Sequence, residues 1–319
     1  MVTDRDAWYV LLVSMGLFLL LALGMGAVAV GWIWLQRTTG EPIVLSLDRL
    51  LLLNALLSGT VLLAPIVARG YKCGWQWRAV FRWCPVPSNI ILLTVLATLT
   101  LNLAVSQLMI GLMQSLVDYA PAFQAVTKES RLVQFLELVT HRNQSVPLLI
   151  LGVMLPALPE ELAFRGVIQQ GFEHRYSPAV AILLTSIAFA MFHLDPVQSV
   201  SVLPTSLFWS WVALRSHSVL PTVIAHACQN GLTLASLLTV GSAEGQTVST
   251  VLTQPPDWRV AAGALLLWIA FTWQLMRRFG TFNRGVSSDG GDNANQVGTA
   301  NGCDGSGSAD LDGISRPAG

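Results

Sequence analysis

The chain has 319 residues, of which 53% are apolar and only 11% carry a charge, and its formal net charge is zero. Ordinary soluble domains are about one quarter charged, so this composition predicts an integral membrane protein. A neutral chain without a strongly basic domain also argues against nucleic acid as a partner.

Eight apolar runs follow one another along the chain, each close to the roughly 20 residues that cross a bilayer. They span residues 8–36, 50–68, 90–113, 147–170, 179–195, 198–214, 219–240 and 258–276. We therefore expect an all-α integral membrane protein, a polytopic bundle of about eight transmembrane helices around an intramembrane polar cavity. The short fifth and sixth runs, separated mainly by Asp195 and Pro196, widen the expected count to seven to nine.

The first run is too long for a signal peptide and lacks clear processing features, so we expect a retained helix. Short cytoplasmic loops carry an excess of Lys and Arg. Such residues lie between the second and third runs and after the last run: Arg69, Lys72, Arg78, Arg82, Arg277, Arg278 and Arg284. The loop at 241–257 contains none. This pattern predicts a multi-pass protein of the cell membrane with both termini in the cytoplasm.

The chain divides into four predicted regions. Residues 1–146 hold N-terminal transmembrane helices and an interfacial linker, in which 131–139 has the apolar spacing of a connecting helix. Residues 147–240 form the core, and 241–284 hold the last transmembrane helix with its flanks. Residues 285–319 are rich in Gly, Ser, Asn and Asp, and this composition predicts a disordered tail. The tryptophans are interpreted as an interfacial belt: Trp75, Trp77, Trp83, Trp209 and Trp211.

The fourth apolar run contains Glu160, Glu161 and Arg165, although each charge at bilayer depth costs roughly 2.5–3.5 kcal/mol on insertion scales. Residues four apart share a helix face, so Glu161 is expected to pair with Arg165 and to leave Glu160 pointing about 100° away. Pro156 and Pro159 precede them, and proline removes a backbone donor, so the helix is expected to kink or restart near Glu160.

Two further pairs have the same spacing of four, Phe189 with His193 and His226 with Asn230. Each pair by itself is compatible with simple hydrogen bonding between membrane helices. Together with the acids, they indicate a site. A carboxylate and a histidine can take a proton from water, and a histidine and an amide can stabilise the oxyanion formed when that water attacks a carbonyl.

These three patterns resemble a known family. EELAFR at 160–165 fits EExxxR, FAMFH at 189–193 fits FxxxH, and HACQN at 226–230 fits HxxxN. The same motifs, in the same order, occur in the CAAX prenyl protease (Ras-converting enzyme) and bacteriocin-processing family, abbreviated CPBP. The resemblance covers roughly residues 147–240.

The resemblance implies an eight-helix intramembrane endopeptidase of the glutamic type that needs no cofactor. Its catalytic residues map to Glu160, His193, His226 and Asn230. The first two would activate water and the last two would form the oxyanion site, while Glu161 and Arg165 would support the first carboxylate. The substrate would be a peptide or a lipidated protein, since eukaryotic members trim prenylated proteins and some bacterial members are linked to peptide-toxin maturation or immunity. Oligomeric state is left open.

Two alternatives remain. Glu160, His193 and His226 could bind zinc in a metalloprotease, although HExxH is absent and an amide such as Asn230 is a poor zinc ligand. Alternatively, the polar residues could serve a non-catalytic transporter or scaffold. Transporters show broken helices in paired positions of two halves, whereas here the polar groups cluster in the second half. The predicted helices also leave one difficulty. They place Glu160 in the middle of the membrane and His193 near the outer end of a short helix, so the depths of these two residues do not match well.

Overall fold

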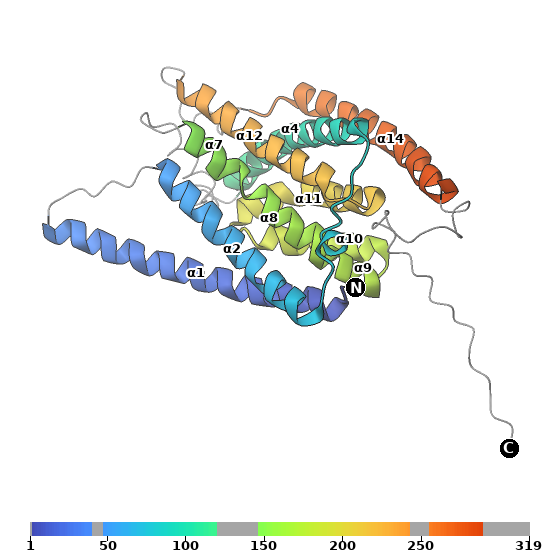
Figure 1. Ribbon diagram of the computed structural model, residues 1–319. Coiled ribbons are helices and arrows are strands. Elements are labelled where there is room, and N and C mark those ends of the chain that lie inside the picture. Colours follow the sequence, from blue (N-terminus) through green and yellow to red (C-terminus); the bar gives the residue numbers. More distant parts are fainter. Residues whose placement is uncertain (1, 40–46, 120–145, 243–254, 290–319) are drawn as a thin grey trace.

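The structure, a computed structural model, describes residues 2–39, 47–119, 146–242 and 255–289, and within these ranges it is helical without strands (Figure 1). The helices are α1 (Asp4–Thr39), α2 (Leu47–Cys73), α3 (Trp77–Val80), α4 (Ser88–Tyr119), α7 (Val146–Met154), α8 (Ala157–Glu161), the π-helix η1 (Leu162–Ile168), α9 (Gln169–Arg175), α10 (Pro178–Met191), α11 (Pro196–Ser216), α12 (Leu220–Ser242) and α14 (Trp258–Asp289). The predicted all-α class is confirmed.

Five helices of the described part are long and apolar enough to cross a membrane, namely α1, α2, α4, α11 and α14. The eight apolar runs all coincide with helices, but the fourth is divided among α7, α8, η1 and α9, and the fifth forms the shorter apolar helix α10. The multi-pass character therefore agrees with the structure. The count of eight crossings and the cytoplasmic location of both termini stay predictions.

Two predictions concern segments at or beyond the edges of the described residues. The expected connecting helix at 131–139 lies outside them. The last helix continues to Asp289, so the region predicted as a tail from 285 begins inside α14.

Local sequence explains where two long helices begin. At the start of α1, the Thr3 backbone N–H donates to the Asp6 carboxylate at 2.9 Å, and the Thr3 hydroxyl lies 3.4 Å from the Asp6 backbone N. This reciprocal arrangement resembles a capping box. At the start of α11, the Asp195 side chain accepts from the Gln198 backbone N–H at 2.8 Å, and Pro196 takes the first position, where no N–H is needed.

The segment α8–η1–α9 lies in the interior of the bundle, where α8 packs against α2 and α12 (Figure 1). Its glycines allow this depth. A Cβ on Gly171 would lie 2.5 Å from the Thr3 carbonyl oxygen and 2.6 Å from the Ala7 Cβ, so α9 can approach α1 closely only because Gly171 has no side chain. The fourth apolar run is thus the central element of the fold.

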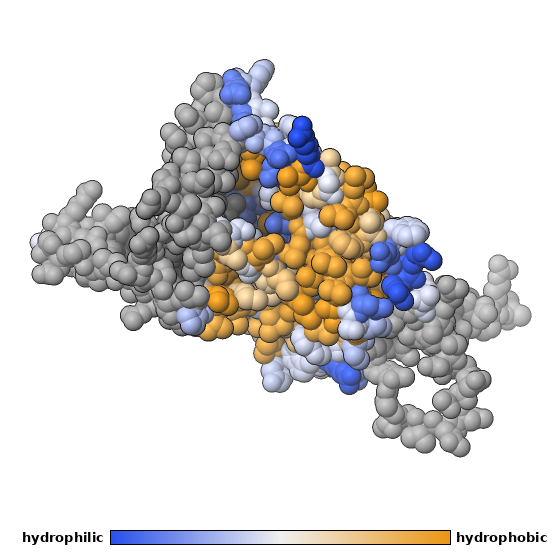
Figure 2. Space-filling model, turned by 90° about the horizontal axis from the view of Figure 1, so that it is seen from above, coloured by the Kyte–Doolittle hydropathy of each residue, from blue (hydrophilic) through white to orange (hydrophobic). Residues whose placement is uncertain are grey.

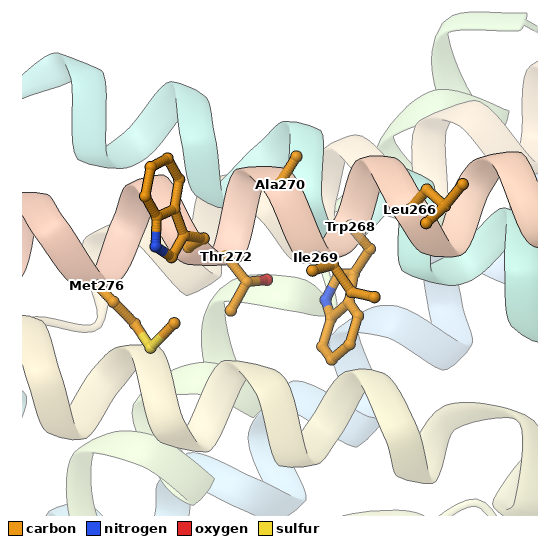
Figure 3. Close-up of a pocket in the computed structure, with 7 residues that line it drawn as sticks. Leu266, Trp268, Ile269, Ala270, Thr272 and Met276 are labelled. Atoms are coloured by element: carbon orange, nitrogen blue, oxygen red, sulfur yellow. The ribbon is translucent and has the colours of Figure 1, made fainter.

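Figure 2 shows a broad hydrophobic face with hydrophilic residues gathered at its margins, as expected for a surface that contacts lipid. Part of the apolar surface belongs to α14. An open pocket of about 430 Å³ on this helix is lined by Leu266, Trp268, Ile269, Ala270, Thr272, Trp273 and Met276 (Figure 3). No residue of the three sequence motifs lines it, so its position gives no support for a catalytic role.

Candidate active site

The helix that carries the first motif is interrupted just before the acids. Helix α7 ends at Met154, a turn covers 155–156, and α8 restarts at Ala157. Pro156 lacks the N–H that a continuous helix would use, and Pro159 falls in the first turn of α8, where proline is tolerated. The predicted restart near Glu160 is confirmed.

After Glu161 the chain continues as the π-helix η1 rather than as an α-helix. Such segments are rare and frequently occur at functional sites. Gly166 lets η1 pack closely against the segment that follows α3, since a Cβ on Gly166 would lie 3.3 Å from the Phe81 Cα. The sequence analysis did not anticipate this element, because seven residues are too few for a distinct periodicity.

Glu161 and Arg165 form the predicted ion pair. Arg165 Nη1 lies 2.8 Å from Glu161 Oε1, and neither side chain is exposed. Arg165 Nη2 also donates to the Ser206 hydroxyl at 2.7 Å. The guanidinium lies over the rings of Phe189 and Trp209, at 4.5 and 5.4 Å from their centroids. The buried cation is therefore held from three sides.

His226 lies between the two carboxylates of the first motif. Its Nδ1 is 3.0 Å from Glu161 Oε1, and its Nε2 is 3.7 Å from Glu160 Oε2. A carboxylate paired with arginine only accepts hydrogen bonds, so Nδ1 must carry a proton. This bond orients the imidazole and directs Nε2 towards Glu160.

Glu160 differs from its neighbour in exposure. Its side chain is 21% exposed, compared with 0% for Glu161. The helical spacing predicted that Glu161 would pair with Arg165 and that Glu160 would point elsewhere, and this prediction is confirmed. Glu160 is the carboxylate of the motif that a water molecule can reach.

His193 lies beyond the end of its helix, which corrects the predicted fifth run of 179–195. Helix α10 ends at Met191, and Pro196 begins the separate helix α11. Even so, the Phe189 ring contacts both His193 and His226, with centroid distances of 5.0 and 5.9 Å. His193 is thus brought to the same cluster as His226 through the Phe189 ring.

The His193 ring is fixed by its own motif. Its Nδ1 lies 3.0 Å from the Phe189 carbonyl oxygen, and a carbonyl only accepts, so Nδ1 carries the proton and Nε2 is an acceptor. Between the described side chains of His193 and Glu160, the structure contains no hydrogen bond or ion pair. The predicted pair of water-activating residues is therefore not in direct contact.

Asn230 makes a different contact from the one expected. Its Nδ2 donates to the Val153 carbonyl at 3.1 Å. This carbonyl belongs to the last turn of α7, where helical carbonyls lose their intrahelical donors. His226 and Asn230 lie on one face of α12, but in this structure they bond different targets. The amide has a second N–H that this contact does not use.

Two residues of α11 contribute to the cluster although the sequence analysis missed them. Trp209 was interpreted as part of an interfacial belt, and this is wrong, because the side chain is 1% exposed and stacks on His226 at 4.4 Å. Its Nε1 donates to the Thr98 hydroxyl at 3.0 Å. Ser206, three positions earlier, binds Arg165. A signal for both was the polar and aromatic pattern SLFWS in the middle of an apolar run.

The zinc alternative would need Glu160, His193 and His226 around one metal ion. Among the residues that the structure describes, no three His, Cys, Asp or Glu side chains lie close enough to hold a metal ion together. His226 also directs one ring nitrogen to Glu161. His226 approaches Glu160 only to 3.7 Å, which is longer than a hydrogen bond.

Comparison with known proteins gives one match. Residues 142–232 match the family model of type II CAAX prenyl endopeptidases, Rce1-like. No curated protein and no solved structure matches the chain. The matched segment contains all three motifs and extends from just before α7 into α12. The resemblance predicted from EELAFR, FAMFH and HACQN is thus confirmed, and residues 142–232 carry an Rce1-like domain of the CAAX protease (CPBP) family in a multi-pass membrane protein.

Proposed function

We propose that the chain is an intramembrane endopeptidase of the glutamic type, which hydrolyses a peptide bond near the membrane surface with water activated by Glu160. One observation carries this proposal. A partly exposed carboxylate, Glu160, adjoins an imidazole whose opposite nitrogen is fixed by a fully buried Glu161–Arg165 pair. An accessible base beside a preorganised donor is what general base hydrolysis requires.

In the proposed reaction, Glu160 accepts a proton from water while the water oxygen attacks the carbonyl carbon of the substrate. The Nε2 acceptor of His193 assists by orienting the water. The carbonyl π bond opens to an oxyanion, which accepts hydrogen bonds from Nε2 of His226 in its imidazolium form, with a proton on each ring nitrogen, and from the second amide N–H of Asn230. The oxyanion then re-forms the C=O bond as the C–N bond breaks, and the proton held by Glu160 passes to the leaving amine, so the products are a carboxylic acid and an amine. No covalent enzyme intermediate and no metal ion take part.

Helix α8 and the start of η1 also border an apolar surface that suits a substrate. A pocket of about 350 Å³ is lined by Trp77, Arg78, Phe81, Trp83, Leu158 and Leu162. Leu158 and Leu162 flank Glu160 and Glu161 in the sequence. On a helix, Leu158 and Leu162 share a face that Glu160 does not share, so this pocket suits an apolar segment of a peptide or lipidated protein that lies on the other side of the helix from the proposed base.

The test is Glu160→Gln in the full chain, reconstituted in liposomes with a prenylated C-terminal peptide and an unprenylated peptide. Loss of a general base lowers the rate by about 10²–10⁴-fold, while the isosteric amide preserves folding. Asp118→Asn, at an exposed carboxylate of α4, is the matched control. Wild-type proteolysis by Glu160→Gln would refute the assignment.

Two additions identify the substrate and exclude the zinc alternative. Comparison of membrane protein C-termini in cells carrying the wild type or Glu160→Gln names the substrates that accumulate uncut. A chelator should leave cleavage unchanged, and loss of activity that zinc alone restores would favour a metalloprotease. Equal cleavage by all variants would instead favour a non-catalytic role.

A further inference from the structure

A column of polar side chains leads away from the proposed site along one face of η1 and α9. Glu161, Arg165, Gln169 and Glu173 follow one another at intervals of four residues. The first three are 0% exposed. The proposed reaction uses the first two, and it assigns no role to the buried amide of Gln169. A completely buried amide inside an apolar bundle is costly unless its polar atoms are bonded.

The column is joined to α11 at two levels. Arg165 Nη2 donates to the Ser206 carbonyl at 3.3 Å, and Gln169 Nε2 donates to the Ser210 carbonyl at 2.8 Å. Both contacts connect residues 41 positions apart, so the two helical segments run parallel and in register here. Gln169 therefore makes the next contact between this segment and α11, four residues after the contact of Arg165.

The far end of the column is anchored by a second ion pair. Gln169 Nε2 also donates to Glu173 Oε1 at 2.7 Å, and Glu173 is paired with Arg82. The side chains of Glu173 and Arg82 are 14% and 11% exposed. The Arg82 backbone is itself fixed, because its carbonyl accepts from the Val219 N–H at 3.1 Å. The amide of Gln169 is thus held by α11, α9 and the loop before α4.

Two polar atoms in the middle of this column have no hydrogen-bond partner among the described residues. They are Arg165 Nε and Gln169 Oε1, and both are buried; at the end of the column, Glu161 Oε2 is a third such atom. One is only a donor and the other only an acceptor. Leaving both unsatisfied would be costly, whereas one water molecule can bond both at once. Arg165 Nε and Gln169 Oε1 therefore have the complementary hydrogen-bonding character that a bridging water requires.

We propose that Gln169 is a positioning residue for the Glu161–Arg165 pair, acting through a buried water molecule that bridges Gln169 Oε1 and Arg165 Nε. The kinetic consequence rests on the proposed function above. Gln169, held by Ser210 and Glu173, limits rotation of the guanidinium and keeps Nη1 on Glu161. Glu161 in turn holds Nδ1 of His226.

The kinetic test compares Gln169→Met with Gln170→Met. The control residue is adjacent and half-buried, and its amide donates to the Ala79 carbonyl outside the column. We expect Gln169→Met to lower kcat about tenfold with KM changed less than about twofold, and Gln170→Met to retain both values. Equal kcat in wild type and Gln169→Met overturns the proposal.

A double-mutant cycle separates positioning from general packing. Arg165→Lys keeps a cation near Glu161 but removes Nε. If Gln169 acts through Nε, adding Gln169→Met to Arg165→Lys causes no further fall in kcat. Full additivity of the two losses overturns the proposal. Thermal unfolding of each variant is measured in parallel. If the substitutions only disturb packing, their losses of stability should add in the double variant, independently of their effects on kcat.

A structural measurement decides the same question if Arg165→Lys is inactive or unfolded. An experimental density map of the folded Glu160→Gln protein, at a resolution that shows waters, should contain a peak within hydrogen-bond distance of both atoms. Its absence refutes the water bridge. This result is independent of turnover, so it also separates the two proposals: equal cleavage by the wild type and Glu160→Gln refutes the protease, whereas an inactive Glu160→Gln protein without the water refutes only the positioning role.

Discussion

Replacement of Arg165 by methionine tests how much the buried ion pair contributes to the fold. The side chains of Arg165 and Glu161 are both 0% exposed. Removing the cation leaves the Glu161 carboxylate buried without its arginine partner, while His226 Nδ1 stays 3.0 Å away. It also removes two hydrogen bonds to Ser206. Methionine has a similar length, so cavity formation contributes little.

Breaking a buried pair by removing one partner costs about 3–5 kcal/mol. His226 still donates to Glu161, so we expect a value near the lower limit, about 3 kcal/mol, which is roughly a hundredfold in the unfolding equilibrium constant. Chemical unfolding in detergent, followed by tryptophan fluorescence, measures it. Trp209, whose ring centroid lies 5.4 Å from the guanidinium carbon, is one of the eleven tryptophans that contribute to this signal.

Two comparisons control this prediction. The double variant Glu161→Gln with Arg165→Met removes the uncompensated charge, so it should be more stable than Arg165→Met alone. Arg69→Met breaks a more exposed pair, with Asp6, in which Asp6 keeps its bonds to Thr3 and Arg69 is 27% exposed. Its cost should be about 1 kcal/mol or less. An equal loss in Arg165→Met and Arg69→Met would refute the reasoning.

Two further changes test the packing of α9 and the turn after α11. Gly171→Ala places a Cβ 2.5 Å from the Thr3 carbonyl oxygen, so it should destabilise the protein by about 1–3 kcal/mol, and Gly263→Ala, whose Cβ meets nothing within 4 Å, should not destabilise it by such overpacking in the same unfolding assay. Partial burial, and then the neighbouring Arg82, lower the pKa of His217 below its ordinary value of 6.5, with Arg215 acting in the same direction and Glu173 opposing. The unfolded state therefore binds more protons below about pH 6.5, and stability falls as the pH drops through that window. His217→Asn, which suits the backbone φ of 49°, should flatten this dependence between about pH 7.5 and 5.5, and an unchanged slope would contradict the assignment.

The first motif illustrates what could be predicted from local spacing. The Glu161–Arg165 pair follows from two residues four apart on a helix, and the break before Glu160 follows from Pro156. Both depend on the geometry of one short segment, which the backbone restricts strongly. The three motifs and their order identified the family for the same reason, because they are contiguous strings of residues.

The contacts of His226 illustrate what local spacing could not predict. The bond from His226 to Glu161 joins residues 65 positions apart, and the bond from Asn230 to Val153 joins residues 77 apart. Helical periodicity places His226 and Asn230 on one face but does not specify which element that face meets. As a result, His226 and Asn230 were expected to bond one shared target, but in the structure they bond different residues.

The sequence alone determined that this protein consists of apolar helices and that one of them carries carboxylates beside a helix break. These features depend only on the composition and residue spacing of single helices. Only the tertiary structure decided that α11 runs parallel to the carboxylate-bearing segment in register, which buries Trp209 against His226 and brings Ser206 to Arg165. The physical reason is that helix packing depends on the shapes of two surfaces at once. Neither surface can be derived from the residues of the other.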